Sequence, residues 1–328
     1  MFQMMVDIAL EPRSVLAANV AKSKNGLSHD LANHLGKFDP HMNDSELLLR
    51  TAFGYNTLGM PHLGTASNIG NIDARMMQQF IMDNITPKKC LIVASGVQNH
   101  DEYVELVKER LSDVLRVPEH KYERKAAEYI GGEYRTWTES PATSIQVAFE
   151  SVPWNSSDLA NFAIMKQLMG ASAGLGGHGR SDAVIRSNAF VDSMSTISSH
   201  FSDSGLFGVN ISGAGSHSAD LLKVALDQLD GMRQPIDEAE LARAKNHFLM
   251  DFYSNIENSG DRLEEVARNY MSNNKLTLFD TAAAVENVSS SSINAAATKL
   301  LAGKPTMVVT GGNINLVPTM TDVQRQLA

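Results

Sequence analysis

The chain has 328 residues, enough for two domains of ordinary size, and its 43% hydrophobic and 20% charged residues are the balance of a folded globular protein. The formal net charge of −9 and the lack of long Lys/Arg clusters argue against nucleic acid as a partner and favour basic ligands. The single cysteine, Cys90, excludes an internal disulfide framework and a cysteine-based zinc or iron–sulfur site, and no apolar run approaches the roughly 18 residues of a membrane-spanning helix.

The first third of the chain is predicted to be largely helical. Its opening residues carry Asp7 and Glu11 and match neither a secretory signal nor a transit peptide, so we expect them to belong to a folded domain. Apolar residues at helical spacing predict helices over 68–85 and 103–115. Between them, the apolar run 90–94 is predicted to be a buried strand, in which Cys90 is an inert thiol.

The composition changes over 117–135, where charged residues and the Gly131-Gly132 pair interrupt the periodicity. We therefore expect residues 1–125 to be the C-terminal part of a first domain, 126–134 a linker and 135–328 a second domain. Asp237, with Glu240 three residues later, predicts a capping box at the start of a long helix. In the second domain, alternation predicts strands over 145–149, 207–211 and 306–310, and helical spacing predicts helices from Ser156 or Ser157 to 169 and over 222–229, 237–255, 261–271 and 290–301.

One spacing occurs twice in the chain. Ile72, Val93 and Gly96 have counterparts 216 positions later, and each set marks a helix, a short break and a strand that ends at glycine. If this is a true repeat, the counterpart of residues 135–210 lies before residue 1. A half-sheet with an open edge needs a cover, so either the chain is a fragment or, as we expect, a separate chain supplies the front of the first domain. The counterparts are Val288, Val309 and Gly312.

A glycine-rich segment follows the helix that ends near residue 169. Part of it matches the G-x-S-x-G nucleophile elbow around Ser172, and part matches the G-x-G-x-x-G dinucleotide fingerprint. Both motifs require a strand before the glycines, whereas a helix is predicted there. The segment is therefore either a loop after a helix C-cap or a flexible loop whose bare backbone binds an extended peptide. Its candidate binding residues are Gly170, Gly174, Gly176, Gly177 and Gly179.

The histidines form no zinc-binding pattern, because neither H-E-x-x-H nor the inverted H-x-x-E-H occurs. We expect neither a metal site nor a catalytic residue in this chain, and a serine hydrolase that uses Ser172 is kept as a remote alternative. The acidic stretch of Glu257, Asp261, Glu264 and Glu265 is either a solvated helix face or a seat for a basic peptide.

Several short strings keep a familiar order over essentially the whole chain. They are His200-Phe-Ser-Asp-Ser-Gly-Leu-Phe-Gly-Val209, Tyr129-Ile-Gly-Gly-Glu133, Leu58-Gly-Met-Pro-His-Leu-Gly64 with Asn68-Ile69, Ala244-Lys-Asn246, and Ile256-Glu-Asn-Ser259 with Leu263-Glu-Glu-Val266. In these strings the chain resembles the pitrilysin-type metallopeptidase family. The resemblance is to its non-catalytic branch, the α subunits of the mitochondrial processing peptidase and the core 2 subunits of respiratory complex III.

The resemblance implies an α+β fold of two similar domains, each a β-sheet with helices packed on it, the first lacking its N-terminal portion. It implies zinc only in a β-type partner, and a mitochondrial location that is peripheral on the matrix side of the inner membrane. The implied partners are a β/core-1-type subunit, cytochromes b and c1 and other complex III subunits of the electron transport chain, and, through the glycine-rich loop, basic presequence peptides.

The loop departs from the family's α subunits, which carry a longer unbroken glycine run. Here Gly179 is followed by Arg180 and Ser181, which favours a structural role over presequence handling. We therefore expect a non-catalytic α/core-2-type subunit on the matrix side of complex III that supports assembly. Presequence recognition through the loop is a second role, which the resemblance implies and the altered loop leaves open. The alternative is the substrate-recognition subunit of a soluble mitochondrial processing peptidase.

Overall fold

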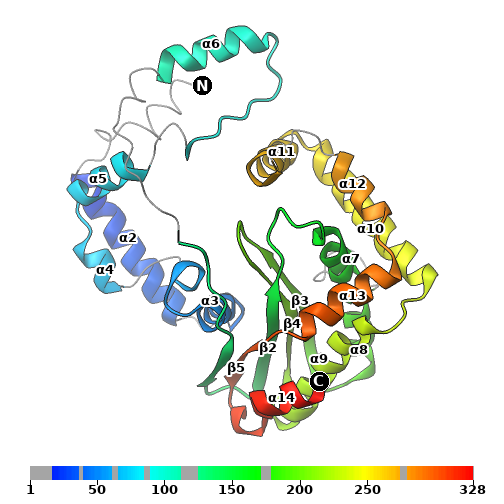
Figure 1. Ribbon diagram of the computed structural model, residues 1–328. Helices are drawn as coiled ribbons and strands as arrows, with labels where there is room; N and C mark the ends of the chain where they lie inside the picture. Colours follow the sequence, from blue (N-terminus) through cyan, green and yellow to red (C-terminus); the bar gives the residue numbers. More distant parts are fainter. Residues whose placement is uncertain are drawn as a thin grey trace. The chain divides into compact units, whose positions relative to one another are not determined.

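The structure is a computed structural model that describes residues 17–36, 40–60, 66–84, 89–111, 125–170, 179–273 and 279–327. The chain divides into two compact units (Figure 1). The first unit comprises residues 1–39 and 61–125, and the second comprises residues 40–60 and 126–328.

The second unit is built on a five-stranded sheet with the order β1-β5-β2-β4-β3 (Figure 1). β1 runs parallel to β5, and the other neighbours are antiparallel. The three predicted strands are confirmed as the centres of β2, β4 and β5, whereas β1 and β3 are additional, and β1 starts inside the segment 126–134. The strands are β1 (Gly132–Trp137), β2 (Ala142–Ser151), β3 (Val191–His200), β4 (Gly205–Ala214) and β5 (Pro305–Gly311). Together with the helices on this sheet, they confirm the α+β class.

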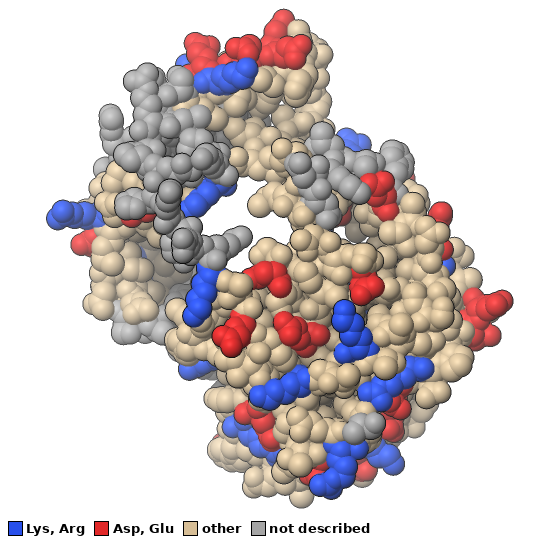
Figure 2. Space-filling model, in the orientation of Figure 1, with Lys and Arg blue, Asp and Glu red and all other residues tan. Residues whose placement is uncertain are grey.

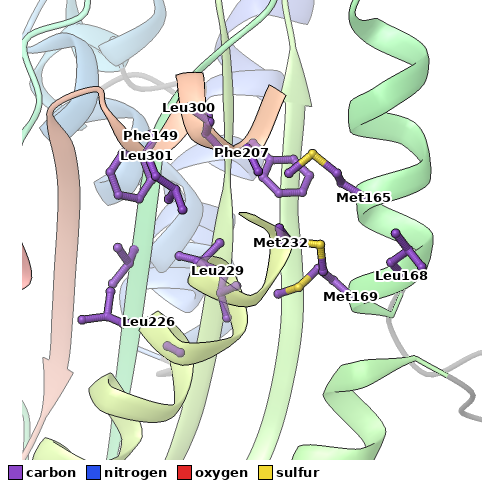
Figure 3. Close-up of a cluster of buried hydrophobic side chains, with 14 of the residues drawn as sticks. Phe149, Met165, Leu168, Met169, Phe207, Leu226, Leu229, Met232, Leu300 and Leu301 are labelled. Carbon is purple, nitrogen blue, oxygen red and sulfur yellow. The ribbon is translucent and has the colours of Figure 1, made fainter. Parts of the chain in front are cut away.

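Helices α7 (Leu159–Met169), α9 (Ser218–Asp230) and α13 (Ser290–Leu301) pack on one face of this sheet. Their apolar side chains meet those of the strands in a single core (Figure 3). Each fully buried Leu, Met or Phe side chain contributes about 1.5–3 kcal/mol to folding, because its apolar surface is removed from water. The core therefore fixes the positions of α7 and β4, between which the glycine-rich segment lies in sequence. Labelled members are Phe149, Met165, Leu168, Met169, Phe207, Leu226, Leu229, Met232, Leu300 and Leu301.

Helix α3 (Pro40–Phe53) packs on the opposite face, against β1, β2 and β5. Its Leu48, Ala52 and Phe53 form a second cluster with three residues of the sheet. The alternation in β2 predicts one buried face, but residues on both faces are buried because α3 covers the second one. The backbone carbonyl of Ala52 also accepts hydrogen bonds from the N–H groups of Ile130 and Gly131, which ties α3 to the start of β1.

Among the remaining helices of the second unit, α10 and α11 confirm the helices predicted over 237–255 and 261–271. Asp237 caps α10, since its carboxylate accepts hydrogen bonds from the N–H groups of Ala239 and Glu240. The Glu240 side chain does not complete a capping box, because it pairs with Arg180. α8, α12 and α14 are additional to the prediction. The helices are α8 (Arg180–Ser187), α10 (Glu238–Glu257), α11 (Ser259–Asn273), α12 (Phe279–Glu286) and α14 (Met320–Leu327), with short 3-10 turns at Thr57–Gly59, Gly215–His217, Gly231–Arg233 and Ile314–Leu316.

The described residues of the first unit contain helices and no strand. The helix expected over 68–85 is divided at Ile72 and Asp73, and the helix expected over 103–115 is confirmed up to Leu111, beyond which the residues are not described. The buried strand expected over 90–94 is wrong: the segment is irregular, and Cys90 is exposed. A strand needs a hydrogen-bonded neighbour, and the described part of this unit offers none. The helices are α2 (Ala17–Gly36), α4 (Ala66–Asn71), α5 (Ala74–Asn84) and α6 (His100–Leu111).

Candidate functional site

Two glycines, Gly170 and Gly179, flank the part of the glycine-rich loop that lies outside the described residues. Gly170 ends α7 with φ of +105° and donates its N–H to the carbonyl of Lys166, and Gly179 stands directly before α8. A Cβ on Gly179 would lie 2.3 Å from the Cα of Gly170, so only glycine allows the two backbones to approach so closely. We call this contact the loop neck. The other three candidate glycines, Gly174, Gly176 and Gly177, lie outside the described residues.

Three polar contacts hold the loop neck in place. The guanidinium of Arg180 donates from Nε and Nη2 to the carboxylate of Glu240, at 2.8 and 3.2 Å, and from Nη1 to the carbonyl of Gly231 at 3.3 Å. The hydroxyl of Thr196 on β3 donates to the carbonyl of Gly170 at 3.1 Å. The neck is thus attached to α10 on one side and to the sheet on the other.

Ser181 lies beside the loop neck with 4% of its surface exposed. Among the described residues its hydroxyl has no hydrogen-bond partner. A Cβ on Gly170 would be 3.4 Å from the Cβ of Ser181, so this buried hydroxyl lies at the base of the loop. Sequence reasoning did not single out Ser181, and nothing in its local pattern marks it.

The serine-hydrolase alternative requires a strand before Ser172 and a helix after it. Ser172 lies outside the described residues, but the element before it is helix α7, which ends at Met169. The nucleophile-elbow context is therefore not present on the N-terminal side of the loop.

The string from His200 to Val209 forms the turn between β3 and β4 and the first half of β4. The N–H of Phe201 donates to the carbonyl of Ser204, and the Ser204 hydroxyl donates to the Glu150 carboxylate. His200 Nδ1 lies 2.8 Å from the carbonyl oxygen of Val152, and its ring packs edge-on against Trp154. Burial lowers the pKa of His200, the charge of Lys166 also lowers it, and the Val152 hydrogen bond partly opposes both. These contacts give the string a structural role.

The four acidic candidates do not form one uniform cluster. Glu257, Asp261 and Glu264 are exposed at the end of α10 and the start of α11. Glu265 is only partly exposed and accepts a hydrogen bond from Arg268 at 2.5 Å, and this guanidinium lies 5.2 Å from the ring centroid of Trp154. On the face drawn in Figure 2, acidic and basic side chains are interspersed over the second unit. The basic-peptide seat stays a prediction, now for the three exposed carboxylates.

A pocket of about 570 Å³ lies between α13, α14 and the sheet of the second unit. Its arginine, Arg233, already donates to the carbonyl of Leu327 at 2.8 Å and pairs with Asp230 at 3.3 Å. The pocket therefore presents no free charge from this side chain. Its other lining residues include Phe149, Thr298, Lys304 and Gln324.

Within the described ranges, no group of three or more His, Cys, Asp or Glu side chains is arranged to hold a metal ion. None of the helices in those ranges is both long and apolar enough to cross a membrane.

Comparison with known proteins places the chain among relatives of one kind. A family profile described as "Peptidase M16 inactive domain" matches residues 71–248, just over half of the chain and across both units. Subunit alpha-2 of the mitochondrial-processing peptidase of Dictyostelium discoideum is 26% identical over 296 residues, which are 88% of this chain and 65% of that protein. The bovine alpha subunit is 22% identical over 349 aligned residues, 99% of this chain and 66% of that protein.

Further matches extend the comparison to a beta subunit and to a solved structure. The protein named "Probable mitochondrial-processing peptidase subunit beta, mitochondrial" of Arabidopsis thaliana is 24% identical over 286 residues, 84% of this chain and 54% of that protein. The chain thus spans between about half and two thirds of the length of these relatives. A chain in a structure of complex III from Candida albicans superposes with a TM-score of 0.81 at 20% identity, covering 99% of this chain and 79% of that one, which shows the fold.

Proposed function

Because the chain belongs to the M16 peptidase family, we propose that it is a non-catalytic α/core-2-type subunit and that it assembles as a core subunit of respiratory complex III on the matrix side of the inner mitochondrial membrane. The observation that carries the proposal is the structural similarity between 99% of this chain and a chain in a complex III structure. The family profile that matches the chain is described as an inactive domain, which agrees with a non-catalytic role. The relatives are named as mitochondrial-processing peptidase subunits, and these names support a mitochondrial location for this chain.

In this proposal the chain acts through its surfaces and carries no chemistry of its own. Catalytic zinc belongs to a β/core-1-type partner, and this chain requires no cofactor. The partner subunits are a β/core-1-type chain, cytochromes b and c1 and the remaining complex III subunits.

The glycine-rich loop contributes to presequence handling in the assembled particle. Two features support this role: the loop neck holds the loop ends together at Gly170 and Gly179, and the glycines between them offer bare backbone to an extended peptide. The acidic surface of the chain favours basic peptides as ligands. Replacing Gly174, Gly176 and Gly177 by alanine in the particle is expected to raise KM for a presequence peptide at unchanged kcat. Unchanged KM would contradict this role.

Isolation of the tagged chain from detergent-solubilised mitochondria tests the assembly. Mass spectrometry of the isolated particle is expected to identify a β-type subunit together with cytochromes b and c1. A particle that contains a β-type subunit without either cytochrome would contradict the complex III assignment and favour a soluble processing peptidase.

A further inference from the structure

The first turn of the eight-residue helix α8, directly after the loop neck, carries hydrogen-bond donors that the described residues leave unused. The first N–H groups of an α-helix have no partner inside the helix and need one from outside it. The N–H of Ala183 donates to the carbonyl of Gly179 at 3.4 Å, whereas no described residue accepts from the N–H groups of Arg180, Ser181 and Asp182. Gly179, at the N-cap, has no side chain that could cap the helix. The turn therefore presents N–H groups beside the neck.

The hydroxyl of Ser181 adds a further donor to this turn. The residue is 4% exposed, and its hydroxyl has no partner among the residues that the structure describes. A Cβ on Gly170 would lie 3.6 Å from the Ser181 Oγ, so the hydroxyl faces the neck. The polar groups of Gly170 are already bonded, the N–H to the carbonyl of Lys166 and the carbonyl to the hydroxyl of Thr196. A buried polar group without a partner lowers stability, so the hydroxyl marks a place for an acceptor atom from elsewhere.

The charges around the turn select the kind of acceptor. The guanidinium of Arg180 pairs with the carboxylate of Glu240, so these two charges cancel. Asp182 lies in the same turn, is partly exposed and adds a second carboxylate. The remaining negative charge repels an anion, although a helix N-terminus by itself attracts one. A neutral carbonyl oxygen accepts the same hydrogen bonds without this repulsion.

The backbone geometry of the neck favours a main-chain carbonyl of an extended peptide. The carbonyls of a helix are bonded within it, whereas those of an extended chain are available to a binding protein. Gly170 and Gly179 place no side chain between the neck and the turn, so another backbone can approach closely. Arg180 and Asp182 are partly exposed, which brings the rim of the turn to the surface, with Ser181 as its floor.

We propose that the first turn of α8 binds one main-chain carbonyl of an extended peptide, through the hydroxyl of Ser181 and the N–H groups of Ser181 and Asp182. The bound peptide carries a basic side chain next to this carbonyl, which the carboxylate of Asp182 attracts. The inference rests on the proposed presequence role of the glycine-rich loop, and it names the atoms of this chain that hold the peptide.

Ser181→Ala tests the hydroxyl in the particle isolated through the tagged chain. The dissociation constant of a fluorescein-labelled basic presequence peptide, measured by fluorescence anisotropy, is expected to rise about two- to tenfold, as for the loss of one neutral hydrogen bond. In urea unfolding, the variant chain is expected to be as stable as the wild type or more stable, because the hydroxyl has no partner to lose. Ser187→Ala, at the exposed last residue of α8, is the matched control and should change neither quantity.

Peptides with a single ester in the backbone identify the bonded carbonyl. An ester carbonyl accepts hydrogen bonds more weakly than an amide carbonyl. At one position, beside a basic residue, the ester is expected to weaken binding to the wild-type particle and to have no further effect on the Ser181→Ala particle, because both changes remove the same contact. Ester effects that are equal in the two particles at every position would overturn the proposal. Inorganic phosphate that displaces the peptide from the wild-type particle alone would mark an anion site and overturn it as well.

The same titrations separate this inference from the proposed function. A wild-type particle that does not bind the presequence peptide would overturn the presequence role of the loop, and this site with it. A wild-type particle that binds the peptide, with an unchanged dissociation constant in Ser181→Ala, would overturn the carbonyl site alone.

Discussion

Arg180 and Glu240 form a two-point ion pair, with Nε 2.8 Å from Oε1 and Nη2 3.2 Å from Oε2. Arg180 is the first residue after the loop neck, and Glu240 lies in the first turn of α10. Their side chains are only 22% and 28% exposed, so solvent screens the pair weakly. The pair therefore fixes one end of the glycine-rich loop to the body of the second unit, sixty residues away in sequence.

Removal of one partner tests this anchor. Arg180→Met is expected to lower the free energy of unfolding by about 1–3 kcal/mol, because the Glu240 carboxylate loses two charge-assisted hydrogen bonds. Urea unfolding of the recombinant chain measures the change. Arg325→Met is the control, since Arg325 is 76% exposed and pairs with Asp322 at the surface, and no measurable change is expected. Equal effects of the two variants would contradict the anchoring role.

The loop neck makes a steric prediction. Gly179→Ala is expected to destabilise the second unit by about 1–3 kcal/mol, because the new Cβ would overlap the backbone of Gly170. Gly260→Ala is the matched control in α11, where the nearest atom to a new Cβ is the Asn258 side-chain oxygen at 3.4 Å. Its stability should stay the same or rise slightly, because alanine favours helix. Wild-type stability of Gly179→Ala in urea would show that the neck is not closed.

Burial of His200 makes stability depend on pH. Its pKa is lowered below 6.5 in the folded chain, chiefly by burial, so the unfolded chain takes up a proton more readily. The free energy of unfolding should therefore fall as the pH drops below about 6.5. His200→Gln should flatten this dependence in urea unfolding series. An equally steep slope in the His200 variant would contradict the assignment.

Tyr129 predicts a second pH effect, at alkaline pH. Burial raises its pKa to about 12, although the hydrogen bond with Thr306 acts in the opposite direction. Because an unfolded tyrosine ionises near pH 10, stability should be lost progressively as the pH rises from about 10 towards 12. Tyr129→Phe should reduce this loss and cost about 1 kcal/mol at neutral pH, since its hydroxyl bonds to the Lys304 carbonyl and to Thr306. An unchanged alkaline profile would refute the prediction.

The strands that could be predicted from sequence are those at the centre of the sheet. Most residues of β2, β4 and β5 are buried. Buried strands need apolar side chains, and these give a pattern that can be read from the sequence. β3 escaped prediction because it is a serine-rich edge strand that pairs with β4 alone, through contacts such as Ser193 with Ser212. β1 escaped because charged residues interrupt it, among them Arg135, which donates to the carbonyls of Val317 and Pro318. Such tertiary contacts leave no local pattern.

The segment 90–94 shows the opposite failure. Its apolar pattern is like that of β5 and therefore predicts a strand. A strand also needs a neighbouring strand to which it is hydrogen-bonded, and a local pattern does not show whether one is present. The loop was found from composition, because glycines are frequent there. The contact of Gly170 with Gly179, and the attachment of Arg180 to Glu240, join residues through the fold and could not be read from spacing.

The haem content of the isolated particle tests the central claim most directly. A reduced-minus-oxidised absorption spectrum of the particle purified through the tagged chain is predicted to show haem b and haem c1 in a fixed ratio to this chain, as expected for a core subunit of complex III. A haem-free particle in which the chain is paired with a zinc-bearing β-type subunit would contradict the account.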